Sequence, residues 1–410
     1  MVKKQLAFVN VDSLNQPMKI VENSSKPSVL TSRQAAETLG VSLRTLYAYV
    51  SRGKIGRTTD GATKESYFNA SELADFVSRR ERGRRPENVA KSSLNYGLPV
   101  LESRISTVKD GRPWYHGRDA ISFSEIATLE EAATLLWNIP LLPEVHSGKL
   151  TREMVDDRPL IQRFSGWLLE ASAGNNASSF ATRHQQLALC HHMLRSATAM
   201  AARSPRWNGD IHNVLASAWK QQGAAAELIR RALVLHADHE LNTSCFAVRC
   251  VASTQASPYA ALLAGCCASM GERHGNFQEA SVLVGEAFRQ GRIDRVIAAR
   301  LSRSGSLPGF SHPLYPKGDP RAKVILDDLR SIVPKKLMKP VDQLLAHAAS
   351  EYGLKPKNDL AVAAMVHVLG MPADAGQSIF LVGRTVGWCA HALEQYSSPL
   401  MIRPRARFIN

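Results

Sequence analysis

Helical periodicity constrains this chain more than any other feature of its sequence. From Phe123 to Gln395, apolar residues recur at the spacing of a helix face, and Gly and Pro fall mostly between these periodic segments. The predicted helices cover residues 123–137, 159–171, 183–202, 211–221, 224–235, 241–253, 258–269, 276–290, 294–303, 322–333, 340–352, 359–369 and 373–395. We see no series of strands joined by turns and no glycine-rich dinucleotide motif. The fold class is therefore predicted to be mainly α, with a short extended segment near Tyr96.

Composition sets the broad class of the protein. Apolar residues make up 44% of the 410 residues, enough to bury a full core, and the length suggests two to three domains. No apolar run reaches the length of a membrane span, and the start of the chain lacks a sustained signal-peptide core, so we expect no membrane association and a cytoplasmic location. The six cysteines form no C-x-x-C pair, so disulfides are not expected.

Positive charge is concentrated towards the N-terminus. The net charge is +15, and residues 1–96 hold 16 Lys and Arg against 9 Asp and Glu. Much of this excess lies in the segment Arg79-Arg-Glu-Arg-Gly-Arg-Arg85. Such a segment is either a solvated linker or a strap that contacts phosphates, and the residues before it decide between the two.

Residues 31–50 have the pattern of a helix, a tight turn and a second helix. Thr31 or Ser32 is placed to cap the first helix, Gly40 to make the turn, and Ser42 to cap the second helix. This arrangement is a helix-turn-helix, which commonly places its second helix in the major groove of DNA.

The residues after this second helix resemble the wing of excisionase and MerR-like DNA-binding domains. A basic turn and a polar loop from Thr58 to Lys64 precede the aromatic pair Tyr67-Phe68. Binding to double-stranded DNA is therefore expected, with the second helix at base edges and the basic turn at phosphates. The predicted DNA-binding residues are Arg44, Thr45, Tyr47, Arg52, Lys54 and Arg57. A module that binds another protein is the alternative.

Titratable residues interrupt the apolar segments between residues 236 and 278. His236-Ala-Asp-His239-Glu and Gly271-Glu-Arg-His274 stand between runs of Ala, Leu, Val and Cys that are typical of buried helices. Buried polar groups cost free energy unless they are hydrogen-bonded, so this cluster is either a structural network or a site that a ligand completes. His236 and His239 could be metal ligands. However, two histidines flanking a glutamate on one helix face are missing, and we predict no metal.

Short motifs then follow one another in the order typical of one enzyme family. From about Tyr96 to Arg407, the sequence resembles the citrate synthase family. The resemblance rests on His236-Ala-Asp-His-Glu-Leu-Asn242, Arg273-His-Gly275, Gly309-Phe-Ser-His312, Asp319-Pro-Arg-Ala322, Asn358-Asp359, Gly383-Arg-Thr-Val-Gly-Trp-Cys-Ala-His391 and Arg403-Pro-Arg405. Chance agreement at so many ordered positions is implausible.

The resemblance implies an almost entirely helical homodimer, in which each subunit has a large domain and a smaller domain that closes over substrate. It implies condensation of oxaloacetate with acetyl-CoA to give citrate and CoA, with acetyl-CoA or another short acyl-CoA as co-substrate and no permanently bound cofactor. The expected division is an N-terminal arm (1–28), a winged helix-turn-helix domain (29–83), a basic and polar linker (84–96), a citrate synthase-like large domain (97–274 and 385–410) and a small domain (275–384).

The same resemblance assigns roles to individual residues. A thioester methyl group is a very weak carbon acid, so Asp359 can remove its proton only if the enolate is stabilised at once. His274, expected to open a helix, would donate to that enolate as a neutral imidazole, and His312 would polarise the ketone of oxaloacetate. The expected binding residues are His239, Arg321, Arg384 and Arg403 for oxaloacetate and Lys317 for CoA. Arginine suits carboxylates because its fork binds in two places, and Arg403 is expected to reach the site of the other subunit.

Several positions depart from the usual pattern of the family. Gly-Asn-Phe-Gln follows His274 where Gly-Gly-Ala-Asn is more usual, and Ser311 and Pro313 flank His312 in place of more common residues. Because these changes surround the expected thioester site, a 2-methylcitrate synthase that uses propionyl-CoA is an alternative. Another alternative is a transcription regulator that uses a synthase-like body to sense metabolites. Single residues also have structural explanations, since Asp359 could simply cap a helix.

Overall fold

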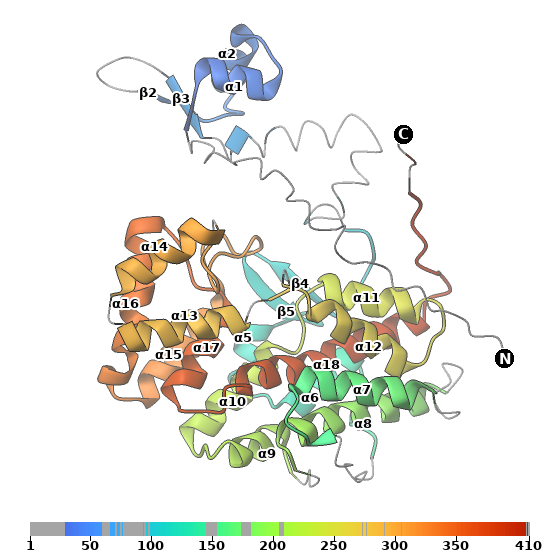
Figure 1. Ribbon diagram of the computed structural model, residues 1–410. Coiled ribbons are helices and arrows are strands. Elements are labelled where there is room, and N and C mark those ends of the chain that lie inside the picture. Colours follow the sequence, from blue (N-terminus) through green and yellow to red (C-terminus); the bar gives the residue numbers. More distant parts are fainter. Residues whose placement is uncertain are drawn as a thin grey trace, which may run out of the picture. The chain divides into compact units, whose positions relative to one another are not determined.

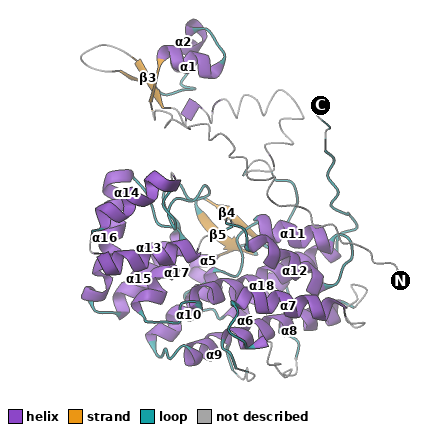
Figure 2. Ribbon diagram, in the orientation of Figure 1, coloured by secondary structure: helices purple, strands orange, loops and turns teal. Residues whose placement is uncertain are grey.

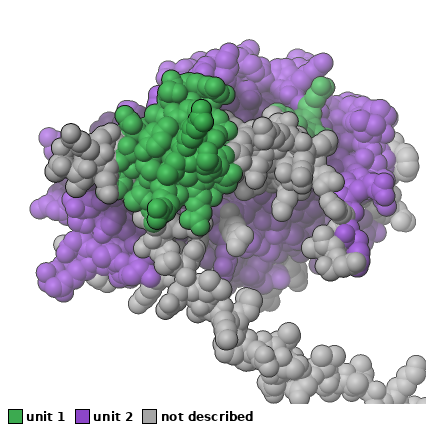
Figure 3. Space-filling model, turned by 90° about the horizontal axis from the view of Figure 1, so that it is seen from above, with its two compact units in different colours: residues 1–102 green, residues 103–410 purple. Residues whose placement is uncertain are grey.

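The structure is a computed structural model, and its contacts divide the chain into two compact units, Met1–Glu102 and Ser103–Asn410 (Figure 3). It describes residues 29–59, 66–69, 72–73, 76, 93, 96, 99–144, 154–173, 182–204, 209–272, 274–275, 277–290, 292–304, 306–406 and 408. The predicted N-terminal arm, the basic segment at residues 79–85 and most of the linker lie outside the described residues.

The first unit is the predicted helix-turn-helix with a small sheet. Its elements are β1 (Val29–Thr31), α1 (Ser32–Leu39), α2 (Leu43–Ser51), β2 (Thr58–Thr59) and β3 (Ser66–Asn69), and the strand order is β1-β3-β2. Strands β2 and β3 pair antiparallel, with Thr58 opposite Tyr67, so they lie where the sequence predicts the wing.

Local signals account for both helices of this unit. Thr31 and Gln34 form a capping box at the start of α1, and Gly40 ends the helix with φ 59°, in the left-handed region that glycine adopts without strain. The Ser42 side chain accepts the backbone N–H of Thr45 and so starts α2. The core of the unit consists of Ala35, Ala36, Leu39, Leu46, Ile55, Phe68 and Leu73.

The second unit is mostly helical, as predicted (Figure 1). Its helices are α5 (Ala120–Phe123), α6 (Leu129–Trp137), α7 (Leu160–Ala173), α8 (Arg183–Ala201), α9 (Ile211–Ala218), α10 (Ala224–Leu235), α11 (Thr243–Ala252), α12 (Pro258–Ser269), α13 (Phe277–Gln290), α14 (Ile293–Ser304), α15 (Pro320–Ile332), α16 (Lys335–Tyr352), α17 (Asn358–Val368) and α18 (Ala375–Tyr396). No helix of the described residues is both long and apolar enough to cross a membrane.

Most predicted helices differ from the structure by only one to three residues at an end, and two differ by more. The segment 123–137 is not one helix, because α5 ends at Phe123 and a capping box between Thr128 and Glu131 starts α6. Helix α16 begins at Lys335, before the predicted start at Pro340, and contains Pro340 in its interior, where proline has no backbone N–H to donate.

The prediction that the chain has no series of strands joined by turns is wrong for residues 106–119. Three short strands, β4 (Ser106–Lys109), β5 (Arg112–Tyr115) and β6 (Arg118–Asp119), form an antiparallel sheet, and Figure 2 shows this sheet among the helices. Asp110 and Gly111 join the first two strands with φ values of 53° and 71°. A two-residue Asp-Gly turn with positive φ at both positions is a strong hairpin signal that the helix-based prediction overlooked.

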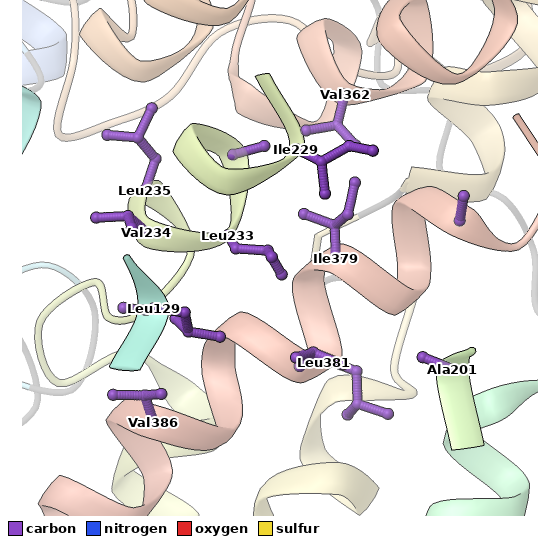
Figure 4. Packing of buried hydrophobic residues seen from close by; sticks show 14 of the residues in the cluster. Leu129, Ala201, Ile229, Leu233, Val234, Leu235, Val362, Ile379, Leu381 and Val386 are labelled. Atoms are coloured by element: carbon purple, nitrogen blue, oxygen red, sulfur yellow. The ribbon is translucent and has the colours of Figure 1, made fainter. Parts of the chain in front are cut away.

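Helix α18 is the centre of the second unit. It contacts α6, α8, α10, α11 and α12, and almost all of its side chains are buried. Figure 4 shows Leu233 of α10 pointing towards α18, with Ile379 and Leu381 nearby. Burying each such side chain stabilises the fold by about 1.5–3 kcal/mol.

Helices α13 to α17 form a second group within this unit. α13 contacts α14, α16 and α17, and α15 contacts α17, while α10–α15 and α17–α18 contacts connect this group to the helices around α18. The group falls within the predicted small domain, residues 275–384. The boundary between a large and a small domain remains a prediction.

Candidate active site

Residues 236–242, which connect α10 to α11, lie directly against the backbone of α18. A Cβ atom added to Gly383 would lie 2.8 Å from Leu233 O, and one added to Gly387 would lie 2.4 Å from Ala237 O. The two glycines are four residues apart and share one face of the helix. They therefore let the end of α10 and the segment after it approach the backbone of α18 more closely than any residue with a Cβ atom would permit.

Strand β4 holds the other side of this connection. Ser106 Oγ donates to the Asp238 carboxylate and accepts the backbone N–H of Glu240 at 2.8 Å. Glu240 Oε1 in turn accepts the N–H of Val108 at 2.6 Å. His239 lies between these two partners, so the Ser106 hydroxyl holds the Asp238 side chain on one side of this histidine and the Glu240 backbone on the other.

Asp238 is the centre of a buried polar cluster. Cys245 Sγ donates to its Oδ1 at 3.4 Å, and His391 Nε2 lies 3.4 Å from its Oδ2 in an ion pair without hydrogen-bond geometry. Burial opposes a charge on His391, but Cys245 and Asp238 beside it raise its pKa to about 10. The ligand atoms of Asp238, Cys245 and His391 lie within 4.8 Å of one another and could hold a metal ion. The ion pair, however, already balances the charge of this cluster.

His239, His312 and Tyr315 form a group of neighbouring rings. His239 Nε2 lies 2.9 Å from the Tyr315 hydroxyl, and the ring centroids of the two histidines are 5.2 Å apart. Burial, assisted by the positive charge of Arg321, lowers the pKa of His239 well below its usual value and that of His312 to about 4. Both imidazoles are therefore neutral near pH 7.

The contacts of His312 fix its tautomer and its place. Its Nδ1 accepts the backbone N–H of Leu314 at 3.2 Å, so a neutral ring carries its proton on Nε2. The loop that holds it runs beside the segment before α17, where the Lys357 N–H donates to Gly309 O at 2.9 Å. This pairing brings His312 close to Asp359 at the start of α17.

Arg321 is buried and paired with Asp319. Its Nε and Nη2 donate to the two carboxylate oxygens at 3.0 Å and 2.8 Å. Asp319 also accepts the backbone N–H of Asn358, whose side chain lies 2.8 Å from His236 Nε2. Burial opposes the charge of Arg321, yet Asp319 keeps its pKa raised. Two nitrogens of Arg321, a residue predicted to bind substrate, are thus bonded to Asp319. The third, Nη1, has no hydrogen-bond partner in the described part of the chain.

Arg384 is a buried cation with open donors. It is 3% exposed, and its Nε donates to His236 O at 3.1 Å. Among the described residues, neither Nη1 nor Nη2 of this side chain forms a hydrogen bond and no carboxylate pairs with it, while its guanidinium lies 5.5 Å from the centre of the Phe380 ring. Its positive charge acts on His236, His239 and His274. Because an uncompensated buried charge is costly, this arrangement favours a site for an anion.

His274 has one bonded and one open ring nitrogen. Nε2 lies 2.9 Å from Ser244 Oγ, which also accepts the Nε1–H of Trp388 at 3.1 Å. Nδ1 is buried and has no hydrogen-bond partner among the residues that the structure describes. Burial, assisted by the charge of Arg384, lowers the pKa of His274 and keeps the ring neutral.

The prediction that His274 opens a helix is wrong. Helix α13 begins at Phe277, and Gly275, with φ 61°, separates His274 from it. A residue in the left-handed region interrupts helical geometry. The neutral imidazole therefore results from burial and not from a helix dipole.

Asp359 lies in the first turn of α17 and faces the segment that holds His274. A Cβ atom added to Gly275 would lie 3.6 Å from Asp359 Oδ1, and the other oxygen, Oδ2, lies 3.1 Å from Lys357 Nζ. The charge of Asp359 also acts on His274 and His312. The structure thus brings the three predicted catalytic side chains together.

Two predicted residues lie apart from this cluster. Arg403 is exposed in the non-helical segment after α18, and Lys317 is exposed in the loop before α15. In the residues that the structure describes, neither contacts the histidine cluster. Their roles with oxaloacetate and CoA remain predictions.

Sequence reasoning missed several residues that support the site. They are Ser106, Ser244, Tyr315, Asp319, Lys357 and Asn358. Asp319 and Asn358 belong to motifs on which the resemblance to citrate synthases rests, so their positions in those motifs could have marked them as site residues. Ser106 lies 132 residues from its partner Asp238, and no local pattern marks such a contact.

In the first unit, the predicted DNA-binding residues fall into two groups. Tyr47 Oη lies 2.9 Å from Ser32 Oγ, and Thr45 Oγ1 lies 3.0 Å from Ser42 Oγ, so both have partners within the unit. The hydrogen bond with Ser32 lowers the pKa of Tyr47. The other group consists of the predicted basic residues, Arg44, Arg52, Lys54 and Arg57, all of which are exposed.

Comparison with known sequences gives related enzymes. "Citrate synthase 2" of Bacillus subtilis (strain 168) is 28% identical over 349 residues, which cover 76% of this chain and 94% of that protein. "Citrate/2-methylcitrate synthase" of the same strain is 32% identical over 189 residues, and "Citrate synthase" of Helicobacter pylori (strain J99 / ATCC 700824) is 36% identical over 200 residues. These matches cover 45% of this chain and only 51% and 47% of those relatives.

Solved structures have the same fold as the second unit. A citrate synthase from Thermoplasma acidophilum, in a ternary complex with carboxymethyl coenzyme A and oxaloacetate, superposes with a TM-score of 0.66 at 20% identity and covers 76% of this chain and 94% of that chain. Citrate synthase from Pyrobaculum aerophilum gives a TM-score of 0.65 at 21% identity and covers 76% of this chain and 91% of that chain.

Family models match both parts of the chain. A helix-turn-helix domain model matches residues 29–81, and the model of the citrate synthase C-terminal domain matches residues 170–405. Since the second match spans more than half of the sequence, this chain belongs to the citrate synthase family, as an enzyme of the citrate synthase type with a helix-turn-helix domain at its N-terminus.

Proposed function

We propose that the chain condenses oxaloacetate with acetyl-CoA to give citrate and CoA. The observation that supports this most is the set of open donors around Asp359. Within the described part of the chain, Arg384 has two unpaired nitrogens and His274 has an unpaired Nδ1, and a neutral His312 carries its proton on Nε2. These groups suit a dianionic keto acid beside a polarised thioester.

The first step would be removal of a methyl proton from the thioester. Asp359 would take the proton while the Nδ1–H of His274 donates to the developing enolate oxygen. This requires the Ser244 hydroxyl to donate to His274 Nε2, so that the single ring proton is on Nδ1. In the structure this hydroxyl donates to Asn242 Oδ1 at 2.7 Å, so its proton must turn from Asn242 to His274 Nε2. Asn242 Oδ1 would then keep the backbone N–H groups of Ser244 and Cys245 as its donors.

Oxaloacetate would then be the electrophile. The Nε2–H of His312 would donate to its ketone oxygen, and the enolate carbon would attack the ketone carbon. Arg384, the free Nη1 of Arg321 and Arg403 of a second subunit would bind the carboxylates, with His239 as a further contact. Closure of a small domain, residues 275–384, would exclude water until the citryl thioester is hydrolysed.

A thiol-release assay tests this function. Purified full-length protein is given oxaloacetate with acetyl-, propionyl- or butyryl-CoA, and free CoA is measured. We expect the highest kcat/KM with acetyl-CoA. CoA release that is fastest with propionyl-CoA would instead make the chain a 2-methylcitrate synthase. No release with any of the three would contradict the condensation.

The alternative acyl donor has support in the sequence and in the relatives. One relative is named "Citrate/2-methylcitrate synthase" and another "2-methylcitrate synthase 2", from Corynebacterium glutamicum. In this chain Phe277 follows the His274 segment, and its ring occupies the space of a side chain at Gly376, where an added Cβ would lie 2.0 Å from the ring. This contact places the Phe277 ring against α18. We place acetyl-CoA first because the relative that matches 76% of this chain is named "Citrate synthase 2".

We further infer that the first unit binds double-stranded DNA. Its second helix exposes Arg44, and Arg52, Lys54 and Arg57 follow it on the surface. A gel shift with the full chain tests this. Binding should weaken steeply between 50 and 200 mM salt, and Arg44→Ala should weaken it further. The absence of any salt-sensitive shift would favour a protein-binding module. DNA binding without CoA release would favour the regulator that senses metabolites.

A further inference from the structure

Lys357 occupies a position that is unfavourable for the helix it precedes. It is the N-cap residue of α17, and its side chain makes no capping hydrogen bond. Lysine has no acceptor atom to offer the free N–H groups, and its positive charge opposes the positive end of the helix dipole. A residue that costs helix stability at this position indicates another role.

The Lys357 side chain is directed to the carboxylate of Asp359. Its Nζ lies 3.1 Å from Oδ2, and both side chains are about one fifth exposed. Its charge also helps to lower the pKa of His312, after the larger effects of burial and Arg321. The ammonium group is therefore within the cluster of catalytic side chains.

The two oxygens of Asp359 have different surroundings. Oδ2 is bound by Lys357, whereas Oδ1 faces Gly275, where an added Cβ would touch it in van der Waals contact at 3.6 Å. Gly275 leaves Oδ1 uncovered on the side of His274. One oxygen is anchored and the other is open towards the place where a thioester methyl group would lie.

We propose that Lys357 is a positioning residue, which holds Asp359 by Oδ2 so that Oδ1 takes the proton from the acyl-CoA. This inference rests on the proposed condensation. Proton abstraction depends on the angle and distance between base and carbon, and a displacement of about 1 Å can lower a rate roughly 100-fold. A carboxylate near the surface without its anchor would sample several rotamers.

Three variants test the proposal. Lys357→Met removes the ion pair, Lys357→Arg retains a cation, and Lys355→Met removes a neighbouring exposed charge as a matched control. For Lys357→Met we expect kcat to fall roughly 10- to 100-fold with KM for oxaloacetate unchanged. The kinetic isotope effect with trideuteroacetyl-CoA should rise, because proton abstraction becomes rate-limiting. Lys357→Arg should recover most of kcat, and Lys355→Met should resemble wild type.

The outcomes separate positioning from structural support. Thermal unfolding of Lys357→Met should stay within about 2 °C of wild type, since an N-cap lysine contributes no capping bond. A wild-type kcat and isotope effect in Lys357→Met would overturn the proposal while leaving the condensation in place. A loss of kcat that matches a large fall in Tm would also overturn it. If wild type itself releases no CoA, the condensation fails and this inference fails with it.

Discussion

At the scale of single residues, the site is defined by polar atoms that lack partners. Arg384 is buried, His274 is half-buried with its Nδ1 inside the protein, and each keeps nitrogen atoms unbonded in the described residues. Most buried polar groups in proteins are hydrogen-bonded, so open donors in a core need a reason. A substrate with two carboxylates and a ketone supplies the missing acceptors.

Ser106 is expected to control how His239 is presented. Ser106→Ala leaves the buried Asp238 carboxylate without one donor and the Glu240 N–H without its acceptor. We predict a loss of about 1–3 kcal/mol in the free energy of unfolding and a higher KM for oxaloacetate. Denaturant titration and steady-state kinetics measure both, with Ser106→Thr as the control that keeps the hydroxyl. An unchanged KM in Ser106→Ala would contradict this role.

His236 should make the fold sensitive to acid. Burial, against a hydrogen bond to Ala232, lowers its pKa from 6.5 to about 4, so the unfolded chain binds a proton more readily than the folded one. The contribution of His236 to the free energy of unfolding is therefore fully present above pH 6.5. It is lost as the pH drops towards 4, and the loss is about 2 kcal/mol at pH 5. Melting temperatures at pH 7.5 and pH 5 test this. His236→Gln should flatten the dependence, and exposed His184→Gln should not. An equally steep profile in His236→Gln would contradict the assignment.

The sequence carried enough information for the chemistry of the site but not for its supporting contacts. Asp359, His274 and His312 were predicted and lie together. Ser244, which faces His274 Nε2, was not predicted, because a serine in an apolar helix has many local explanations. Such contacts depend on tertiary packing and leave no periodic pattern.

At the scale of elements, the close contact between α18 and the segment after α10 is the critical one. A Cβ atom at Gly387 would lie 2.3 Å from Asp238 Oδ1, so Gly387→Ala should lower the free energy of unfolding by about 1–3 kcal/mol and raise KM for oxaloacetate. Gly166→Ala in α7 is the matched control, since nothing lies within 4 Å of its added Cβ. It should stabilise the protein by about 0.5–1 kcal/mol. Equal effects of the two substitutions in denaturant titrations would contradict this account of α18.

Apolar spacing predicted the helices but could not predict the small sheet, whose usable signal was the Asp110-Gly111 turn. Long helices such as α8 and α18 have several turns over which apolar spacing accumulates. Strands β4 to β6 have two to four residues each, too few for alternation to be distinguished from chance. The break between α5 and α6 was missed because the Thr128 cap lies within a segment that otherwise fits one helix.

At the scale of the whole molecule, we predict that the active unit is a dimer with shared sites. If Arg403 acts in the site of a second subunit, mixing Arg403→Ala with Asp359→Asn gives hybrid dimers in which one site is complete. Random reassociation of the two inactive variants should restore about one quarter of wild-type activity. No recovery, with mixed dimers verified by a tag on one variant, would place Arg403 outside the site of the other subunit.

Asp359→Asn tests the central claim most directly. The variant keeps the size of the side chain but has no base, so we predict that citrate formation from oxaloacetate and acetyl-CoA is lost at least roughly 1,000-fold. Oxaloacetate binding, measured by calorimetry, should stay within about threefold of wild type, because Arg384 and the histidines remain. Citrate formation at the wild-type rate in Asp359→Asn would contradict the account.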